Sequence, residues 1–440
     1  MAEFKWKGKS GKLKVKKHFQ RSTFGPQFGF FKIFGLLIFG TGIWYLFTSG
    51  EAIETASGDN LNAHVTTKKV RDTVAVKLPK IKKDSVIFTP LEKFEAQSAD
   101  SFFNVLATRA RFNGSALVAH EGKILYQRQF GFADFKTKEM LTDTSEFQLG
   151  SVSKQFTAVS IMMLKEKGLL NYDDSICKFF PDFPYKGVTI RMCLDHRSGL
   201  PNYMFTCSAE CRDQSTLIDN QQVMQMLAEY KPQCYFKPNK LFNYCNTNYA
   251  VLAAVVEKVS GLNFADFARK NIFEPCKMTR TFIYDKYDTV VPNKLTGYNA
   301  GYRKAGTDFL DGVAGDKGVY STVTDLLKWD QALYSDKLVS QATLKDAYTP
   351  KTRWMSNHSY GFGWHLMYFD NDTIVYHGGW WHGFNCDFIR DIKKKTTIIV
   401  LSNHINWCIR NSWSLLALFR KTPLANMPTE GAKDEENAGM

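Results

Sequence analysis

Ser151 and Lys154 are the first residues whose types and spacing suggest chemistry, and they lie three positions apart in the stretch 148–157. An amphipathic run begins there and stops at Gly168. Its apolar residues recur at helical spacing, namely Val152, Phe156, Val159 and Met163. Because residues i and i+3 share one face of a helix, the hydroxyl of Ser151 and the amine of Lys154 can meet.

Such a pair can carry out nucleophilic catalysis. An alcohol becomes a good nucleophile when a neighbouring base takes its proton, and a desolvated amine can be that base because burial disfavours its charged form. The N-terminus of the helix adds backbone N–H groups where an oxyanion would develop. Serine and lysine are common residues, however, and a capping serine followed by a solvated lysine is the ordinary explanation. The catalytic interpretation is favoured over this one only if further residues with suitable chemistry occur elsewhere in the chain.

One companion is the pair Tyr244 and Asn246, which lies just before a helical pattern that Gly261 ends. The phenol of Tyr244 can relay protons, and the amide of Asn246 can hold a substrate carbonyl. A loop tyrosine followed by a helix-capping asparagine is the alternative for these two residues taken alone.

The other companion is the glycine-rich stretch 375–384, which contains His377, Gly379 and Trp380. Its glycines allow backbone to approach a ligand closely. His377 is expected at the end of a strand, with a pKa near neutrality. The alternative is a glycine-rich turn that carries an exposed histidine.

Elements at the two ends of the chain must position these residues. A helix is expected near 98–112, followed by a hairpin with strands around 116–120 and 124–130. Mainly helical or loop sequence follows the Ser151 helix to about residue 283. Further strands are expected at 360–368, 373–377, 384–390 and 396–401, before a final helix at 406–420. The order predicts an α/β (α+β) fold in which the two ends build one sheet around a helical insertion.

In order and spacing, Ser-x-x-Lys, Tyr-x-Asn and His-x-Gly together resemble the penicillin-recognising serine hydrolases. The similarity is to the class C β-lactamase-like branch, which includes D-alanyl-D-alanine carboxypeptidases and β-lactamase-fold esterases. It extends over about 103–403 and includes the connecting phrases 147–154, 194–201 and 242–249. It implies a β-lactamase/transpeptidase-like fold, with an antiparallel sheet flanked by helices and an all-helical subdomain beside the active site.

The resemblance also implies a role for each motif residue. Ser151 is the expected nucleophile, Lys154 its base and Tyr244 the proton relay to the leaving group. Asn246, His377, Gly379 and Trp380 are the expected substrate-binding residues. The oxyanion hole is expected to consist of the N–H groups of Ser151 and Trp380. Two residues of a further family phrase, His196 and Ser198, are expected to be structural, and His382 to be a rim contact or simply exposed.

The third motif departs from the Lys-Thr-Gly of many relatives, because the chain has His377, Gly378 and Gly379. This favours esters, amides or D-amino-acid cell-wall peptides over penicillins, with weak β-lactamase activity at most. The alternative to this serine hydrolase is a catalytically silent ligand-binding protein on the same fold. No cofactor and no metal site are expected, since the nine cysteines lack zinc spacing. Cys207, Cys211 and Cys234 can either form a disulfide or remain reduced.

The net charge of +14 suggests nucleic acid or membrane until it is located along the chain. Most of it lies in 1–21 and 64–85, and no nucleic-acid fold accompanies it, so no nucleic-acid partner is expected. Between these basic blocks lies an apolar run of membrane-spanning length. The expected organisation is a basic cytoplasmic segment 1–28, a transmembrane signal anchor 29–48, a linker 49–95, an extracytoplasmic (periplasmic) hydrolase domain 96–420 and a disordered tail 421–440. A cleaved signal peptide or a buried helix are the alternatives for the anchor.

Overall fold

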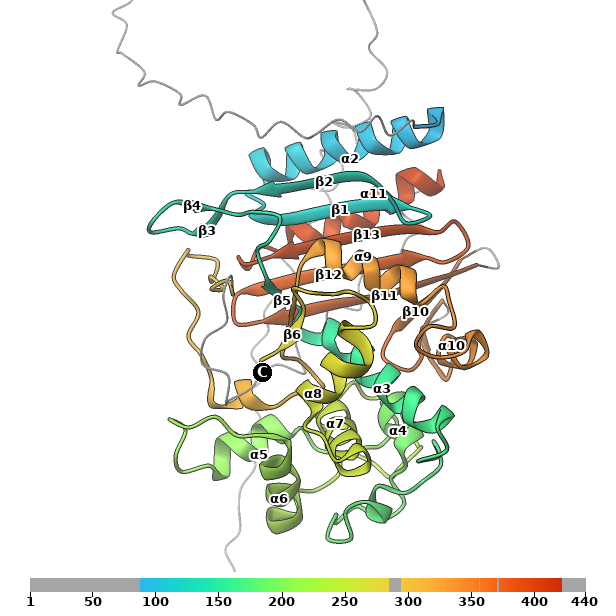
Figure 1. Cartoon of the computed structure of the whole chain (residues 1–440). Coiled ribbons are helices and arrows are strands. Elements are labelled where there is room, and N and C mark those ends of the chain that lie inside the picture. Colours follow the sequence, from blue (N-terminus) through green and yellow to red (C-terminus); the bar gives the residue numbers. More distant parts are fainter. Residues whose placement is uncertain (1–87, 285–293, 356, 370–371, 422–440) are drawn as a thin grey trace, which may run out of the picture. The chain divides into compact units, whose positions relative to one another are not determined.

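The computed structural model describes residues 88–284, 294–355, 357–369 and 372–421 (Figure 1). An eight-stranded antiparallel sheet has the order β2-β1-β13-β12-β11-β10-β9-β8. Its strands are β1 (Gly114–His120), β2 (Lys123–Phe130), β8 (Thr352–Met355), β9 (His358–Tyr360), β10 (His365–Phe369), β11 (Asp372–Trp381), β12 (Phe384–Asp391) and β13 (Thr396–Ser402). Because β1 pairs with β13 from Gly114–Ser402 to His120–Thr396, the two ends of the described chain share one sheet, as expected.

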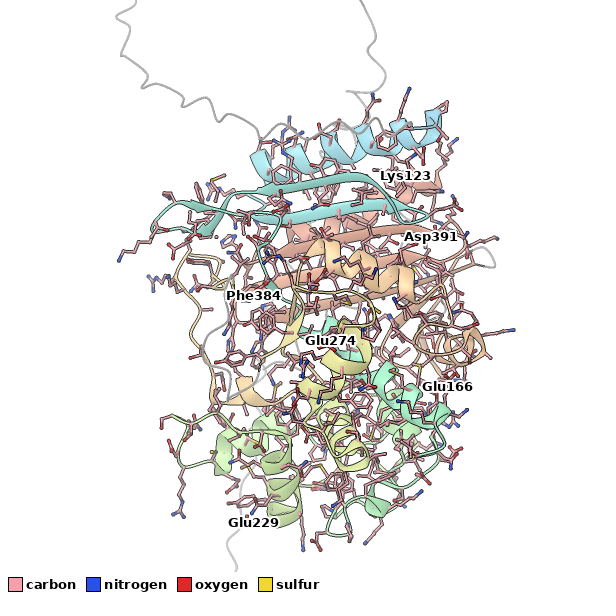
Figure 2. All side chains as sticks on the ribbon, viewed as in Figure 1. Lys123, Glu166, Glu229, Glu274, Phe384 and Asp391 are labelled. Carbon is pink, nitrogen blue, oxygen red and sulfur yellow. The ribbon has the colours of Figure 1, made fainter. Side chains whose placement is uncertain are left out.

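Helices cover both faces of this sheet. In β1 alternate residues point to opposite faces, so Ala116 and Val118 join one core cluster and Leu117 and Ala119 the other. The first cluster includes residues of α2 (Pro90–Arg109) and α11 (Ser412–Arg420), and the second includes residues of α3 (Lys154–Glu166) and α9 (Val323–Ala332). Figure 2 labels Phe384 and Asp391, which begin and end the fully buried strand β12.

The insertion between the hairpin and the later strands is mainly helical. Figure 1 shows its helices gathered on the opposite side of the sheet from α2. Its central helix is buried almost all round from Asn246 to Val256 and packs against the other four helices of the insertion and against α3. The helices are α4 (Ile190–Leu194), α5 (Tyr203–Glu210), α6 (Asn220–Tyr230), α7 (Asn246–Ser260) and α8 (Phe264–Ala268).

Short elements complete the described chain. They are β3 (Phe132–Asp134), β4 (Glu139–Met140), β5 (Phe147–Gln148), β6 (Phe282–Ile283), β7 (Val319–Ser321), α10 (Gln341–Ala347) and the turns η1 (Gly150–Ser153), η2 (Ile176–Lys178), η3 (Arg269–Phe273), η4 (Phe309–Gly312) and η5 (Trp407–Asn411). Strands β5, β7 and β6 form a small sheet. Since η1 directly follows β5, this sheet helps to place the turn that carries Ser151.

Several expected elements differ in their bounds from the observed ones, and two of these differences have a clear local cause. The first helix begins at Pro90, because Thr89 and Glu92 form a reciprocal capping box, and it includes residues 90–95 of the expected linker. The expected strand 360–368 is two strands, β9 and β10. They are separated at Gly361 and Gly363, and the φ of +87° at Gly363 is incompatible with a continuous strand.

The expected segments 1–28 and 29–48 lie outside the described residues, as do most of the linker and nearly all of the tail. None of the helices that the structure describes is long and apolar enough to cross a membrane.

The ion pair between Arg390 of β12 and Asp330 of α9 joins the sheet to a helix that covers it. Its Nε–Oδ1 distance is 2.6 Å, and each side chain is 1% exposed. Arg390 also donates to the hydroxyl of Tyr348 at 2.8 Å. The pair is therefore fully desolvated, and removal of one partner would leave a buried charge without compensation.

We expect Arg390→Met to lower the free energy of unfolding by about 3–5 kcal/mol, because it leaves Asp330 buried and unpaired. Urea unfolding followed by circular dichroism measures the change. A matched control is Lys395→Met, which removes the exposed pair between Lys395 and Glu121. Surface pairs contribute at most about 1 kcal/mol, so equal effects of the two substitutions would contradict the assignment.

Candidate active site

Ser151 lies in the 3-10 turn η1, and α3 begins at Lys154 directly after it. The sequence pattern places both residues in one helical run, whereas the structure divides that run between a 3-10 turn and an α-helix. The expected contact between Ser151 and Lys154 is confirmed, because residues three apart eclipse each other in a 3-10 turn. The Nζ of Lys154 lies 2.9 Å from the Oγ of Ser151.

The amine of Lys154 is held by groups from three separate segments. Besides contacting Ser151, it donates to the Oδ1 of Asn246 and to the carbonyl oxygen of Asp316, each at 2.9 Å. It also lies 4.8 Å from the ring centre of Tyr244. Lys154 is fully buried. The solvated lysine considered as an alternative is therefore wrong.

Tyr244 and Asn246 lie at the start of α7, where Cys245 is the N-cap residue without a side-chain cap bond. Asn246 is the first residue of the helix, and its side-chain oxygen contacts Lys154. The capping alternative for Asn246 is therefore wrong. Tyr244 is 7% exposed beside Lys154. The structure thus brings the first and second motifs together.

His196 and Ser198 hold this segment in place. The Nδ1 of His196 accepts from the backbone N–H of Cys245 at 3.1 Å and lies 3.0 Å from the Nδ2 of Asn248. Ser198 donates to the Oδ1 of Asn248. The His196 ring also lies 4.3 Å from the ring of Tyr244. These contacts support the expected structural role of both residues.

His377 has neither the exposure nor the pKa that the sequence predicts for it. It lies inside β11, fully buried. The hydroxyl of Tyr360 lies 3.1 Å from Nε2, and Nδ1 lies 2.5 Å from the carbonyl oxygen of Gly378. Since a carbonyl can only accept, Nδ1 carries the proton and Nε2 accepts from Tyr360. Burial lowers the pKa of His377 well below its usual value, and neighbouring His365 and Lys154 lower it further. The expected pKa near neutrality and the exposed-histidine alternative are both wrong.

Gly379 and Gly150 allow two backbones to touch. The pairing of β10 with β11 ends at His365–Tyr376, so the following part of β11 faces η1. A Cβ added to Gly379 would lie 2.0 Å from the oxygen of Leu149, and one added to Gly150 would lie 2.6 Å from the nitrogen of Trp380. Larger residues at either position would separate the backbones of Ser151 and Trp380.

Sequence reasoning included Gly318 in a phrase shared with the family but missed Gly315 and Asp316 just before it. Thr157 donates to the carbonyl oxygen of Gly315 at 2.7 Å, and Lys154 donates to that of Asp316. The two glycines have φ values of +100° and +98°. The spacing of these glycines was the only available signal, because a backbone carbonyl has no residue signature.

Asp311 also went unrecognised. It accepts from the Nε1 of Trp381 at 2.6 Å and lies 3.2 Å from the Nε2 of His382. Burial raises the pKa of Asp311, but the hydrogen bond and charge of His382 outweigh this, and the pKa falls below its usual value. The side chain of His382 is 27% exposed, in agreement with a rim position.

All nine cysteines are free in the structure. Of the two open possibilities for Cys207, Cys211 and Cys234, the reduced state is the one observed. Burial raises the pKa of Cys207 to about 12, so its thiol is unreactive.

Three buried histidines, His196, His365 and His377, have pKa values lowered first of all by burial. For His365 the pKa falls to about 3. The unfolded chain binds a proton at this histidine below about pH 6.5, whereas the folded protein does not until about pH 3. Folding stability should therefore decrease as the pH is lowered from about 6.5 to about 3.

We expect His365→Phe, which keeps an aromatic ring, to flatten the loss of stability between pH 6 and 4. The expected difference in slope is about 1.4 kcal/mol per pH unit, the value for one proton. Urea unfolding at half-unit intervals of pH measures it. Above pH 7.5 the two proteins should show parallel stabilities, and identical slopes below pH 6 would contradict the neutral state of His365.

Comparisons with known proteins agree with this geometry. Residues 94–407 match the family model described as Beta-lactamase. The chain is 38% identical over 321 residues to penicillin-binding protein 4* of Bacillus subtilis, covering 69% of this chain and 70% of that one. It is 26% identical to a D-aminopeptidase of Brucella anthropi, covering 71% of this chain and 60% of the relative.

A solved penicillin-binding protein of Bacillus halodurans has the same fold, with a TM-score of 0.64 and 22% identity. The match covers 75% of this chain and 100% of that one. The family model alone spans well over half of the chain and includes all three motifs. The protein therefore belongs to the beta-lactamase family, the serine hydrolases of the penicillin-recognising fold.

Proposed function

We propose that this serine hydrolase cleaves an ester, an amide or a D-amino-acid peptide through an acyl-enzyme on Ser151. The contact set of Lys154 carries the proposal. The oxygens of Asn246 and Asp316 can only accept, so they engage two N–H bonds of the amine. A neutral amine then presents its lone pair to the Oγ of Ser151, 2.9 Å away. This arrangement supports Lys154 as the base that takes the serine proton.

The proposed roles of the other motif residues follow from their positions around Ser151. The Oγ of Ser151 bonds to the substrate carbonyl carbon, and the carbonyl oxygen becomes an oxyanion stabilised by the N–H groups of Ser151 and Trp380. Tyr244 carries the proton to the leaving nitrogen or oxygen as that bond breaks. Water then attacks the acyl-enzyme and releases Ser151. Asn246 orients the substrate amide while it holds Lys154.

The substrate is better described as a neutral acyl compound than as a penicillin. Both nitrogens of His377 are occupied inside the protein, and Gly378 has no hydroxyl. The third motif therefore offers no charged side chain to a substrate carboxylate. The names of the relatives, a penicillin-binding protein and a D-aminopeptidase, favour an amide or peptide bond next to a D-amino acid.

We expect Ser151→Ala to lower turnover of p-nitrophenyl esters by at least about 10³-fold, because loss of a nucleophile leaves only binding and oxyanion stabilisation. Labelling by a fluorescent fluorophosphonate should disappear, while the melting temperature should barely change. Ser208→Ala, on an exposed serine of α5, is the matched control. Undiminished turnover in Ser151→Ala would exclude the mechanism and favour a silent ligand-binding protein.

The proposed site of action is outside the cytoplasm, with residues 29–48 as the anchor. The basic residues before this run favour a cytoplasmic N-terminus. Protease added outside the cytoplasmic membrane should digest the hydrolase domain and spare an epitope tag at Met1. Protection of the domain and loss of the tag would reverse the orientation, and recovery of untagged protein without the membrane would indicate a cleaved signal peptide.

A further inference from the structure

Lys154 and Lys317 are the only lysines that are buried among the residues that the structure describes, at 0% and 3% exposure. Both reach Asp316, in the loop before β7. Lys154 donates to the backbone oxygen of Asp316 at 2.9 Å, whereas the ammonium of Lys317 lies 3.6 Å from its Oδ1. The mechanism uses the first lysine and gives the second no role, although burial of an ammonium is costly.

Lys317 connects the helical insertion to the sheet. It donates to the hydroxyl of Tyr203 in α5 at 2.7 Å and to the backbone oxygen of Val313 at 3.4 Å. Its ammonium also lies 4.9 Å from the ring centre of Trp381 in β11, next to Trp380. Contacts from three segments therefore fix the charge of Lys317 beside Asp316.

Asp316 is a buried carboxylate whose charge must be balanced. Its side chain is 1% exposed, and its Oδ2 accepts from the hydroxyl of Tyr203 at 3.1 Å. Burial raises the pKa of Tyr203 well above its usual value, and the charge of Asp316 raises it further, so the phenol stays a donor. The Oδ1 accepts no hydrogen bond from the described residues. At 3.6 Å Lys317 acts on this oxygen as a charge and not as a hydrogen-bond donor.

The surroundings of Lys154 are uncharged apart from this ion pair. The oxygens that contact its amine, from Ser151, Asn246 and the backbone of Asp316, carry no charge. Phenols, a thiol and imidazoles also face it, namely Tyr244, Tyr249, Cys245, His196, His365 and His377. Burial raises the pKa of the thiol and lowers the pKa values of the imidazoles, so these groups are neutral at pH 7. A carboxylate beside the amine would favour its protonated form, the opposite of what a base requires.

We propose that Lys317 is a positioning residue that keeps Lys154 neutral, because its ammonium balances the carboxylate of Asp316. The role rests on the proposed function, since it concerns the protonation of the same base. With Lys317 in place, the buried pair is neutral overall and does not favour a proton on Lys154. Without Lys317, the carboxylate would draw a proton onto Lys154, because an amine is more basic than a carboxylate. Ser151 would then lose its base at neutral pH.

The test follows the rate at which a fluorophosphonate labels Ser151 between about pH 5 and pH 9. The Oγ of Ser151 displaces fluoride from phosphorus while Lys154 takes the proton, so the rate rises with pH as Lys154 becomes neutral. Lys317→Met should move the midpoint of this rise to higher pH by about one unit or more, because the unbalanced carboxylate favours the ammonium. Asp316→Asn leaves the charge of Lys317 unbalanced and should move the midpoint to lower pH.

A double variant separates the effect of charge from that of structure. Lys317→Met combined with Asp316→Asn removes both charges, so the midpoint should return toward the wild-type value. A purely structural role of Lys317 predicts no such return, because the double variant loses the contacts of Lys317 as well. Exposed Lys337→Met is the matched control and should leave the midpoint unchanged.

The midpoint is obtained from rates within one protein, so a fraction of unfolded molecules does not change it. If Lys317→Met fails to fold, the opposite shift in Asp316→Asn tests the same balance of charge. An unchanged midpoint in the single variants, or shifts of both in one direction, would overturn the role of Lys317. Labelling that persists in Ser151→Ala would reject the proposed function and this role with it, whereas labelling that needs Ser151 but has an unmoved midpoint rejects this role alone.

Discussion

The site depends on the burial of one amine. A lysine can stay buried only when acceptors replace the water that it loses, and Lys154 finds them on α7 and on the loop before β7 as well as on Ser151. Each acceptor comes from a different part of the chain. The sheet, the helical insertion and the loop around Asp316 must therefore all be in place before the serine has a base.

The second requirement is contact between two backbones. Gly150 precedes the nucleophile and Gly379 belongs to β11, and a side chain on either glycine would overlap the opposite strand or turn. This contact is possible because the pairing of β10 with β11 extends only to His365–Tyr376, which leaves the end of β11 to η1. An arrangement that relies on backbone N–H groups needs such glycines, since donors aimed at an oxyanion must stand where side chains would otherwise be.

Polar side chains beneath the site make it rigid and restrict its chemistry. His196 orients the backbone before Asn246, and His377 connects Tyr360 to its own strand. Both rings are buried and neutral, so they contribute hydrogen bonds instead of charge. A buried ion pair, that of Asp316 with Lys317, lies behind Lys154, which contacts the backbone oxygen of Asp316.

The sequence by itself determined which residues contact one another in the active site, and it determined the outline of the fold. Helical spacing predicted the contact of Ser151 with Lys154, and apolar runs bounded by turn residues predicted most strands of the sheet, because both depend on local geometry. The spacing of the three motifs identified the family, which the family model confirms. Only the tertiary structure decided the state of His377, since its burial depends on Tyr360 and on the strands around it. It alone revealed the part played by Asp316, because a backbone carbonyl looks the same at every position until the fold brings a buried amine to it.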